Sequence, residues 1–275
     1  MDGRGLTVDE ALFESMSGAT GRELQVERTA AVRAAVAAGR FLRALRARLA
    51  DPDVDVASLR READAGANAL ICRELRHAFP DDPILSEESA DEPGRLDSHR
   101  VWIVDPLDGT REFAELGRTD WAVHVALAID GDPKIGVVAL PGQDRVVLDG
   151  PRAGPRPHAR CPRIVVSRTR PPREAEWVRD ELGGALHPLG SAGAKTIAVV
   201  DGAADLYIHG GGQYEWDSAA PVAVARAAGL HASRLDGSPL VYNQASPDLP
   251  DLLICRVEYA ERALAALRAA PAPSS

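Results

Sequence analysis

An apolar segment, Val101–Val104, runs directly into a cluster of carboxylates, Asp105–Thr110 (DPLDGT). The segment has the β-branched, apolar character of a buried strand, so the carboxylates must emerge where that strand ends inside the fold. Pro106 has no N–H and is expected to stop strand pairing, and Gly109 allows a tight bend and the close approach of a ligand. The turn is therefore predicted to aim both of its aspartates toward one point.

Two further acidic clusters also lie where an apolar element meets a polar turn. Ser86–Ser89 (SEES) follows a short predicted strand, and Trp216–Ala220 (WDSAA) opens an Ala-rich helix. Taken singly, the clusters have structural interpretations: a turn for DPLDGT, a solvated face for the two glutamates, and a helix N-cap for Asp217. Taken together, they predict a site for Mg²⁺, which prefers carboxylate and carbonyl oxygens, with the carbonyl of Leu107 between the two aspartates.

Charge and composition narrow the function classes. The chain of 275 residues has a net charge of -9 and no Lys/Arg block, which argues against a nucleic-acid polymer as partner. An acidic chain would repel an anionic substrate unless bound cations invert the local field. Three widely spaced cysteines without a CxxC pair argue against a disulfide framework or a zinc site. With no apolar signal core and no apolar run of membrane-spanning length, a cytoplasmic protein without a membrane partner is expected.

The pattern of apolar residues divides the chain into a first half that is α+β with antiparallel strands and a second half that is α/β. The Pro-, Gly- and Arg-rich segment Gly150–Arg163 separates them. The predicted parts are a flexible leader (1–20), a domain with most metal ligands (21–155), a substrate domain (156–268) and a disordered tail (269–275). Helices are predicted at Glu27–Leu49, Asp64–Phe79, Glu174–Leu182, Ala192–Val200, Ser218–Ala228 (with Pro221 in its first turn) and Glu258–Leu267. Strands are predicted at Pro83–Leu85, Val101–Val104, Trp121–Ile129, Lys134–Leu140, Arg145–Leu148, Ile164–Ser167, Leu206–Ile208 and Leu252–Val257.

The motifs together resemble the signatures of the inositol monophosphatase superfamily. The stretch from Trp102 to Phe113 matches its W-[IV]-[IV]-D-P-[IL]-D-G-T-x-x-F signature, and Trp216–Ala220 matches W-D-x-A-A. This resemblance implies a layered αβαβα sandwich with the metal site between its two halves. Within the superfamily the sequence is most similar to the 3′(2′),5′-bisphosphate nucleotidase branch, and GGQYEWDSAA resembles actinobacterial members. The segments that carry this finer likeness are Leu85–Glu88, Arg111–Phe113, Val166–Arg168 and Gly190–Lys195.

The resemblance also implies residue roles. Glu87, Asp105 and the carbonyl of Leu107 resemble ligands of a first metal ion, and Asp105, Asp108 and Asp217 resemble ligands of a second. A third, weaker ion would lie near Glu87 and an acidic residue of the preceding helix, for which Asp64 is the candidate. Two to three Mg²⁺ ions and inhibition by lithium are therefore expected.

Catalytic and substrate contacts follow from the same likeness. Thr110, paired with Asp64, would orient the attacking water, with Glu87 as the third catalytic group. The main-chain amides of Gly109 and Thr110 would cradle the phosphate. The residues predicted to contact substrate are Glu87, Leu107, Asp108, Gly109, Thr110, Ser167, Arg168, Ser191, Lys195, Tyr214 and Asp217. None of the seven histidines lies in a suggestive motif, so they are interpreted as surface or packing residues.

The implied activity is hydrolysis of the 3′-phosphate of 3′-phosphoadenosine 5′-phosphate, giving AMP and phosphate, by a metal-activated water. Such an enzyme would act on a small phosphorylated metabolite in sulfate assimilation, and a homodimer is expected. The alternatives are an inositol-1-phosphate or fructose-1,6-bisphosphate phosphatase of the same family, and a non-catalytic binder of magnesium and phosphate ligands. A haloacid-dehalogenase-type phosphatase is disfavoured because two residues separate the aspartates of DPLDGT, where that class has one.

Overall fold

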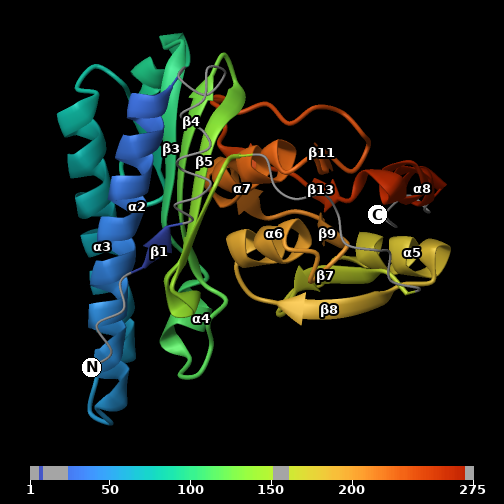
Figure 1. Ribbon diagram of the computed structural model, residues 1–275, viewed down its shortest axis with the longest axis horizontal. Coiled ribbons are helices and arrows are strands. Elements are labelled where there is room, and N and C mark those ends of the chain that lie inside the picture. Colours follow the sequence, from blue (N-terminus) through green and yellow to red (C-terminus); the bar gives the residue numbers. More distant parts are fainter. Residues whose placement is uncertain (1–5, 9–23, 151–160, 270–275) are drawn as a thin grey trace.

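The computed structural model describes residues 6–8, 24–150 and 161–269. Its elements stack as helix, sheet, helix, sheet and helix layers, which confirms the predicted αβαβα sandwich (Figure 1). Most of the predicted leader, the segment 151–160 and nearly all of the predicted tail lie outside the described residues. Thr7–Val8 of the predicted leader forms strand β1, which pairs in parallel with the strand at Arg145–Leu148.

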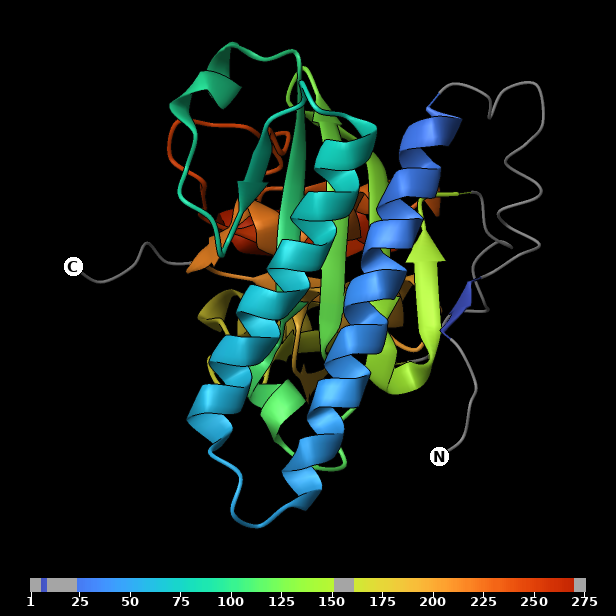
Figure 2. The same ribbon diagram turned by 90° about the vertical axis from the view of Figure 1, so that its left-hand side faces the viewer.

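Two long helices form the outer layer of the first half. α2 (Gln25–Arg46) is followed by a 3₁₀ turn, η1 (Ala47–Ala50), and packs beside α3 (Val56–Ala78) across one face of the first sheet (Figure 2). Alanines along the buried side of α2 let its backbone lie close to the sheet. The prediction that the second helix begins at Asp64 was wrong, because Asp55 caps the helix by accepting a hydrogen bond from the Ala57 amide at 3.0 Å.

The first sheet has six strands, in the order β1-β6-β5-β4-β3-β2. Its members are β2 (Ile84–Ser86), β3 (Arg100–Asp108), β4 (Ala122–Ile129), β5 (Asp132–Leu140) and β6 (Arg145–Leu148), with β1 at one edge. The predicted β4–β5 hairpin is confirmed. Pro106 was expected to stop strand pairing, and this expectation was wrong. Asp105 pairs with His124, and pairing resumes after a bulge, where Asp108 pairs with Ala122.

The middle layer comes from the second half of the chain. α6 (Ala192–Val200) and α7 (Glu215–Ala227) lie between the two sheets, and α7 packs on β3, β4 and β5. α7 begins three residues before its predicted start, so Pro221 lies in the helix interior and not in its first turn. The hydrophobic core around these helices joins residues of both sheets, including Val138 and Tyr207.

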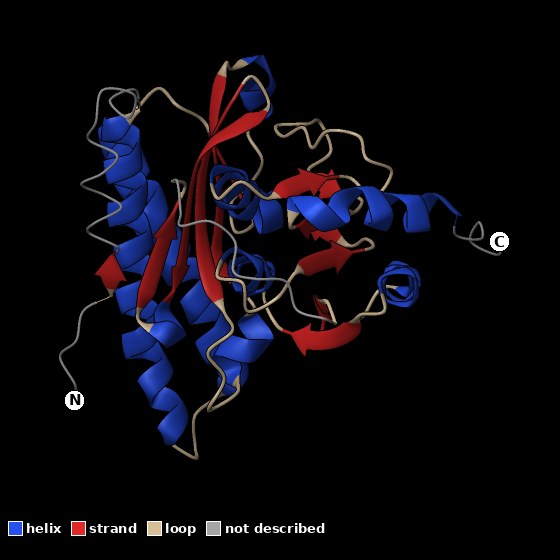
Figure 3. Ribbon diagram, turned by 45° about the vertical axis from the view of Figure 1, so that its right-hand side comes forward, coloured by secondary structure: helices blue, strands red, loops and turns tan. Residues whose placement is uncertain are grey.

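The second sheet has five strands in the order β11-β13-β9-β7-β8, and two helices cover its far side (Figure 3). The strands are β7 (Arg163–Ser167), β8 (Ala185–Leu189), β9 (Leu206–His209), β11 (His231–Ser233) and β13 (Leu252–Cys255). The covering helices are α5 (Arg173–Leu182) and α8 (Val257–Ala269), and the short remaining elements are η2 (Pro93–Asp97), α4 (Thr110–Ala114), η3 (Pro141–Gln143), β10 (Gln213–Tyr214) and β12 (Asp248–Leu249). β8 was not predicted, because it is a half-exposed edge strand that contains Pro188.

Candidate active site

Three carboxylates converge between the first sheet and the middle layer. Asp105, Asp108 and Asp217 each place a carboxylate oxygen within 4.8 Å of the others. The bulge at the end of β3 brings the first two together, and the first turn of α7 supplies the third. These residues form a group that could hold a metal ion, as the sequence predicted.

Hydrogen bonds hold the turn and the helix start in place. Asp105 Oδ1 accepts from the Leu107 amide at 3.0 Å, and the Thr110 hydroxyl donates to the Leu107 carbonyl at 3.2 Å. Asp217 Oδ2 accepts from the Tyr214 amide at 2.7 Å. Asp217 is therefore the third residue of its helix and not the N-cap, and its other oxygen remains available to a cation.

The carboxylates repel one another and are removed from water, and their pKa values reflect this. Burial, followed by the charges of Glu87, Asp108 and Asp217, raises the pKa of Asp105 well above its usual range. Burial and the charge of Asp108 raise the pKa of Asp217 to about 7. A cluster of this kind stays ionised at neutral pH if a cation neutralises it, which is the electrostatic requirement of a divalent metal site.

Asp108 differs from its neighbours. Although burial opposes it, contacts with His124, Lys195 and Ser191 lower the pKa of Asp108 below its ordinary value. Its Oδ2 accepts hydrogen bonds from the Ser191 hydroxyl and from the Gly193 amide, the latter at 2.8 Å. His124 and the start of α6 therefore favour the ionised form of this carboxylate.

Two further acidic residues flank this group. Glu87 follows β2, and partial desolvation together with the charges of Asp217, Glu88, Asp108 and Asp64 raises its pKa to about 7. Asp64 lies half-buried on α3, and desolvation followed by the charge of Glu88 raises its pKa to about 6. The structure thus brings both predicted residues into electrostatic reach of the site.

A cleft of about 350 Å³ opens beside the carboxylates. Among the residues predicted to contact substrate, its lining includes Glu87, Gly109, Thr110, Ser167, Arg168, Ser191 and Lys195. It also includes Arg111, Glu112, Thr169 and Arg170, which sequence reasoning did not select. Tyr214 is not part of this lining; its ring stacks on that of Trp216 with centroids 4.8 Å apart.

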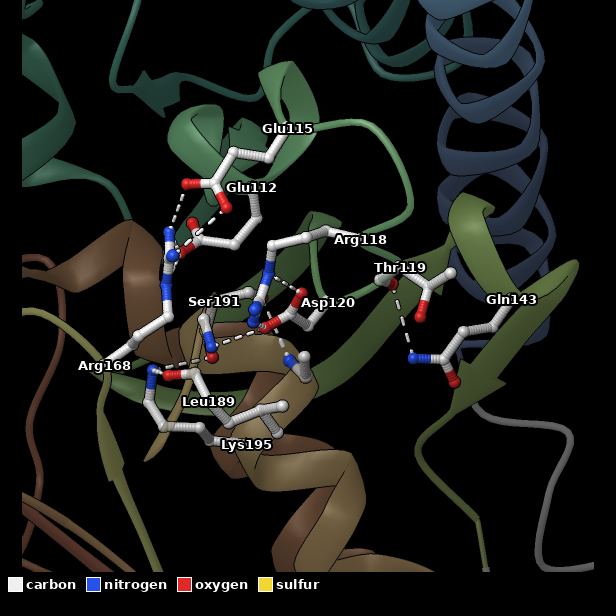
Figure 4. A network of polar contacts seen from close by, with 12 residues as sticks. Glu112, Glu115, Arg118, Thr119, Asp120, Gln143, Arg168, Leu189, Ser191 and Lys195 are labelled. Carbon is white, nitrogen blue, oxygen red and sulfur yellow. Dashed lines mark hydrogen bonds and ion pairs between the residues drawn. The ribbon is translucent and has the colours of Figure 1, made fainter. Parts of the chain in front are cut away.

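Two cations of the cleft, Arg168 and Lys195, are held by neighbouring groups. The Arg168 guanidinium lies between two carboxylates of the α4 region, 2.8 Å from Glu112 Oε1 and 2.6 Å from Glu115 Oε1 (Figure 4). The buried Lys195 ammonium donates to the Ser191 carbonyl at 2.8 Å and lies 5.1 Å from the centre of the Tyr207 ring. Arg168 therefore links the two halves across the cleft.

The interpretation of the histidines as surface or packing residues did not foresee the polar contact that His124 makes. This residue of β4 is fully buried, and its Nε2 lies 3.3 Å from Asp108 Oδ2. The available signal was a single polar side chain within the otherwise apolar run Ala122–Ile129. A periodicity search that looks only for apolar residues passes over it.

A group of carboxylates that could hold a metal ion thus lies beside a cleft. A profile of the inositol monophosphatase family matches residues 23–271. The chain belongs to the inositol monophosphatase family. No helix among the described residues of this family member is long and apolar enough to cross a membrane.

Relatives within the family are found in mycobacteria and enterobacteria. The chain is 52% identical over 220 residues to a 3′-phosphoadenosine 5′-phosphate phosphatase of Mycobacterium tuberculosis, covering 76% of this chain and 82% of the relative. The corresponding protein of Mycobacterium leprae is 47% identical over 268 residues, covering 90% and 96%. The 3′(2′),5′-bisphosphate nucleotidase CysQ of Escherichia coli K12 is 38% identical over 196 residues, covering 66% and 78%.

Solved structures of the family share the fold. CysQ from Bacteroides thetaiotaomicron aligns with a TM-score of 0.73 and 27% identity, covering 85% of this chain and 98% of that one. An inositol monophosphatase from Anabaena aligns with a TM-score of 0.71 and 25% identity, covering 90% and 97%.

Proposed function

We propose that this inositol monophosphatase family member removes the 3′-phosphate of 3′-phosphoadenosine 5′-phosphate, releasing AMP and phosphate. The observation that carries the proposal is 47% identity over 90% of the chain to a mycobacterial protein that bears the name of this phosphatase. The carboxylate group and the adjoining cleft support it, because they offer a metal site beside a space large enough for a small phosphorylated metabolite.

The donor set fits Mg²⁺. Asp105, Asp108 and Asp217 would hold one ion, and Glu87, Asp105 and the Leu107 carbonyl a second, since all are oxygen donors on adjacent segments. Asp64 with Glu87 is the candidate for a third. When bound, the ions would supply a water of lowered pKa and stabilise negative charge on the leaving oxygen. Lithium, a small hard cation, would compete for the position formed by Asp105, Asp108 and Asp217.

The chain's own residues would orient the reactants. The Thr110 hydroxyl and Asp64 would position the attacking water, and the main-chain amides of Gly109 and Thr110 would bind the scissile phosphate. Thr110 is fixed for this role by its hydrogen bond to the Leu107 carbonyl. Phosphate recognition by main-chain amides leaves the carboxylates free for cations.

A second phosphate needs its own cationic contact. We assign this role to Arg168 and Lys195, with Ser167 and Ser191 as polar neighbours, because all four line the cleft. Arg170 lines the same cleft and is added as a candidate. Tyr214, exposed at the start of α7, is kept as a nucleoside contact, which would require the substrate to extend beyond the cleft lining.

The test is a substrate panel with purified protein. Phosphate release from 3′-phosphoadenosine 5′-phosphate, inositol 1-phosphate and fructose 1,6-bisphosphate is measured with Mg²⁺, with EDTA, and with Mg²⁺ plus lithium or sodium. We expect the highest kcat/KM for the nucleotide, AMP as the product, no turnover in EDTA, and inhibition by lithium but not by sodium. Equal kcat/KM for all three substrates would favour a general sugar-phosphate phosphatase. Binding without turnover would favour a non-catalytic protein. Size-exclusion chromatography of the same sample tests the expected homodimer.

A further inference from the structure

We propose that His124 is a positioning residue that fixes the β3 turn, which carries Asp105 and Asp108, relative to the start of α7, which carries Asp217, from behind the metal site. The inference rests on the proposed metal-dependent function. It assigns a role to a residue of β4 that lies outside every motif described above.

The location of His124 is unusual for an imidazole. It sits in the middle of the central strand β4, its side chain is 0% exposed, and its cross-strand partner is Asp105. The rest of that strand is apolar. Burying a polar ring in such a strand is unfavourable unless its nitrogens find polar partners.

Those partners belong to both segments that carry the three aspartates, the β3 turn and the start of α7. Nε2 lies 3.3 Å from Asp108 Oδ2, a contact whose alignment falls short of a hydrogen bond. Nδ1 lies 3.9 Å from Asp105 Oδ2 and 3.2 Å from the carbonyl oxygen of Trp216, the residue before Asp217. Because a carbonyl only accepts, Nδ1 carries the hydrogen that faces Trp216. One ring thus touches both aspartates of the β3 turn and the start of α7.

The backbone of Gly193 packs closely on the ring from the α6 side. A Cβ placed on Gly193, in the first turn of α6, would lie 2.2 Å from His124 Nε2 and 3.1 Å from the Ala122 side chain. The Gly193 amide also donates to Asp108. The imidazole therefore lies between the sheet and α6, and it can couple the position of the β3 turn to that of the start of α7.

Groups that hold metal-ligating carboxylates typically affect metal affinity or activity by about 10–100-fold when they are removed. The variants are His124→Leu, which keeps a similar volume without polar atoms, and His124→Asn, which keeps an N–H donor. Val125→Ala is the matched control, because the neighbouring side chain is equally buried but faces the α2–α3 core. Mg²⁺ binding is measured directly by calorimetry, and kcat, KM and the Mg²⁺ concentration for half-maximal rate are measured on the nucleotide.

We expect His124→Leu to weaken Mg²⁺ binding by about 10–100-fold, with KM at saturating Mg²⁺ within about 3-fold of wild type. His124→Asn should recover most of the Mg²⁺ affinity, and Val125→Ala should melt at a lower temperature with unchanged Mg²⁺ affinity. Wild-type Mg²⁺ affinity in His124→Leu, or an equal loss in Val125→Ala, would overturn the proposal.

A second variant covers the case in which His124→Leu does not fold. Gly193→Ala presses on the ring from the α6 side, and it should weaken Mg²⁺ binding while His124 itself is retained. Unchanged Mg²⁺ affinity in Gly193→Ala would also overturn the proposal. If the proposed function itself is wrong, the wild-type protein will lack Mg²⁺-dependent turnover. If only the role of His124 is wrong, the wild type will turn over and the variants will bind Mg²⁺ as wild type does.

Discussion

Asp105, Asp108 and Asp217 carry the same chemical group in three different surroundings. Asp108 receives hydrogen bonds from the start of α6, so its charge is compensated by the protein. Asp105 is buried beside other carboxylates and accepts one amide hydrogen bond, which leaves its charge poorly compensated. The protein therefore stabilises one carboxylate by itself and leaves the others to be neutralised by a bound cation.

This contrast makes Asp105→Asn an informative variant. We expect turnover to fall by about 100-fold or more, since a carboxylate shared by two proposed metal positions is lost. The metal-free variant should melt at or above the wild-type temperature at pH 8, because a buried and repelled charge has been removed. Steady-state kinetics with Mg²⁺ measure the loss of turnover, and thermal melts in EDTA measure the melting temperature of the metal-free protein. A variant that keeps most of its activity would remove Asp105 from the metal site.

Arg168 tests the proposed recognition of a second phosphate. Losing a charged hydrogen bond typically costs about 1.5–3 kcal/mol, so Arg168→Ala should lower kcat/KM on the nucleotide by about 10–150-fold. The loss on inositol 1-phosphate should be much smaller, because that substrate has one phosphate. Arg33→Ala, an exposed position on α2, is the control. Equal losses on both substrates would mean that Arg168 serves chiefly to tie β7 to Glu112 and Glu115.

At the scale of elements, the site depends on how closely the middle layer approaches the first sheet. α7 carries Asp217, and its backbone lies against β5 at Gly136. A Cβ at Gly136 would lie 2.4 Å from the Ala220 carbonyl oxygen and 2.7 Å from the Ala223 side chain. The absence of a side chain at this one position of β5 thus sets the distance between Asp217 and the β3 turn.

Gly136→Ala is therefore expected to destabilise the protein by about 1–3 kcal/mol, the usual result of overfilling a packed core. Its Mg²⁺ affinity should also fall, because α7 must move away from the sheet. Urea denaturation measures the first effect and calorimetry the second. The control is Gly94→Ala, where an added Cβ meets nothing within 4 Å. Equal stability of the two variants would contradict the packing argument.

At the scale of the whole molecule, the carboxylates couple folding to pH and to metal binding. The pKa values of Glu87 and Asp217 are raised to about 7 from ordinary values of 4.5 and 3.8. The folded, metal-free protein thus binds protons more tightly than the unfolded chain, so its stability falls as pH rises from about 4 to about 7. Mg²⁺ must displace these protons, so binding should release them below about pH 7.

We accordingly expect Mg²⁺ to raise the melting temperature more at pH 8 than at pH 6. Thermal melts in EDTA and in saturating Mg²⁺ at both pH values measure the effect, and calorimetry in two buffers of different ionisation enthalpy counts the protons released at pH 6. Asp105→Asn serves as the control, since its Mg²⁺ response should be small at both pH values. An equal Mg²⁺ shift at pH 6 and pH 8 in wild type would show that these carboxylates do not govern binding.

Sequence patterns predicted an α+β first half, an α/β second half and the carboxylates of the site, and the family resemblance implied the layered sandwich. The carboxylates follow from short-range patterns: DPLDGT places two of them at a bend within ten residues of the start of their buried strand, and WDSAA opens a helix by its composition. The meeting of Asp217 with the other two aspartates depends on the tertiary structure. The apolar periods of α2, α6 and the β4–β5 hairpin are equally local, and these elements agree closely with their predicted ranges. Residues that are neighbours in the sequence remain neighbours in space in any compact fold, so local patterns are sufficient to predict them.

The extent of the elements, and the side chains that support the site, depended on long-range contacts. β8 forms because it pairs in parallel with β7 at the edge of the second sheet. Arg168 contacts Glu112 because β7 and α4 face each other across the cleft. His124 reaches Asp108 and the Trp216 carbonyl through contacts between residues 16 and 92 positions apart in the chain. Hydrogen bonds and burial depend on proximity in the folded structure and not on separation along the chain. These partners could therefore be identified only after the layers had brought their segments together.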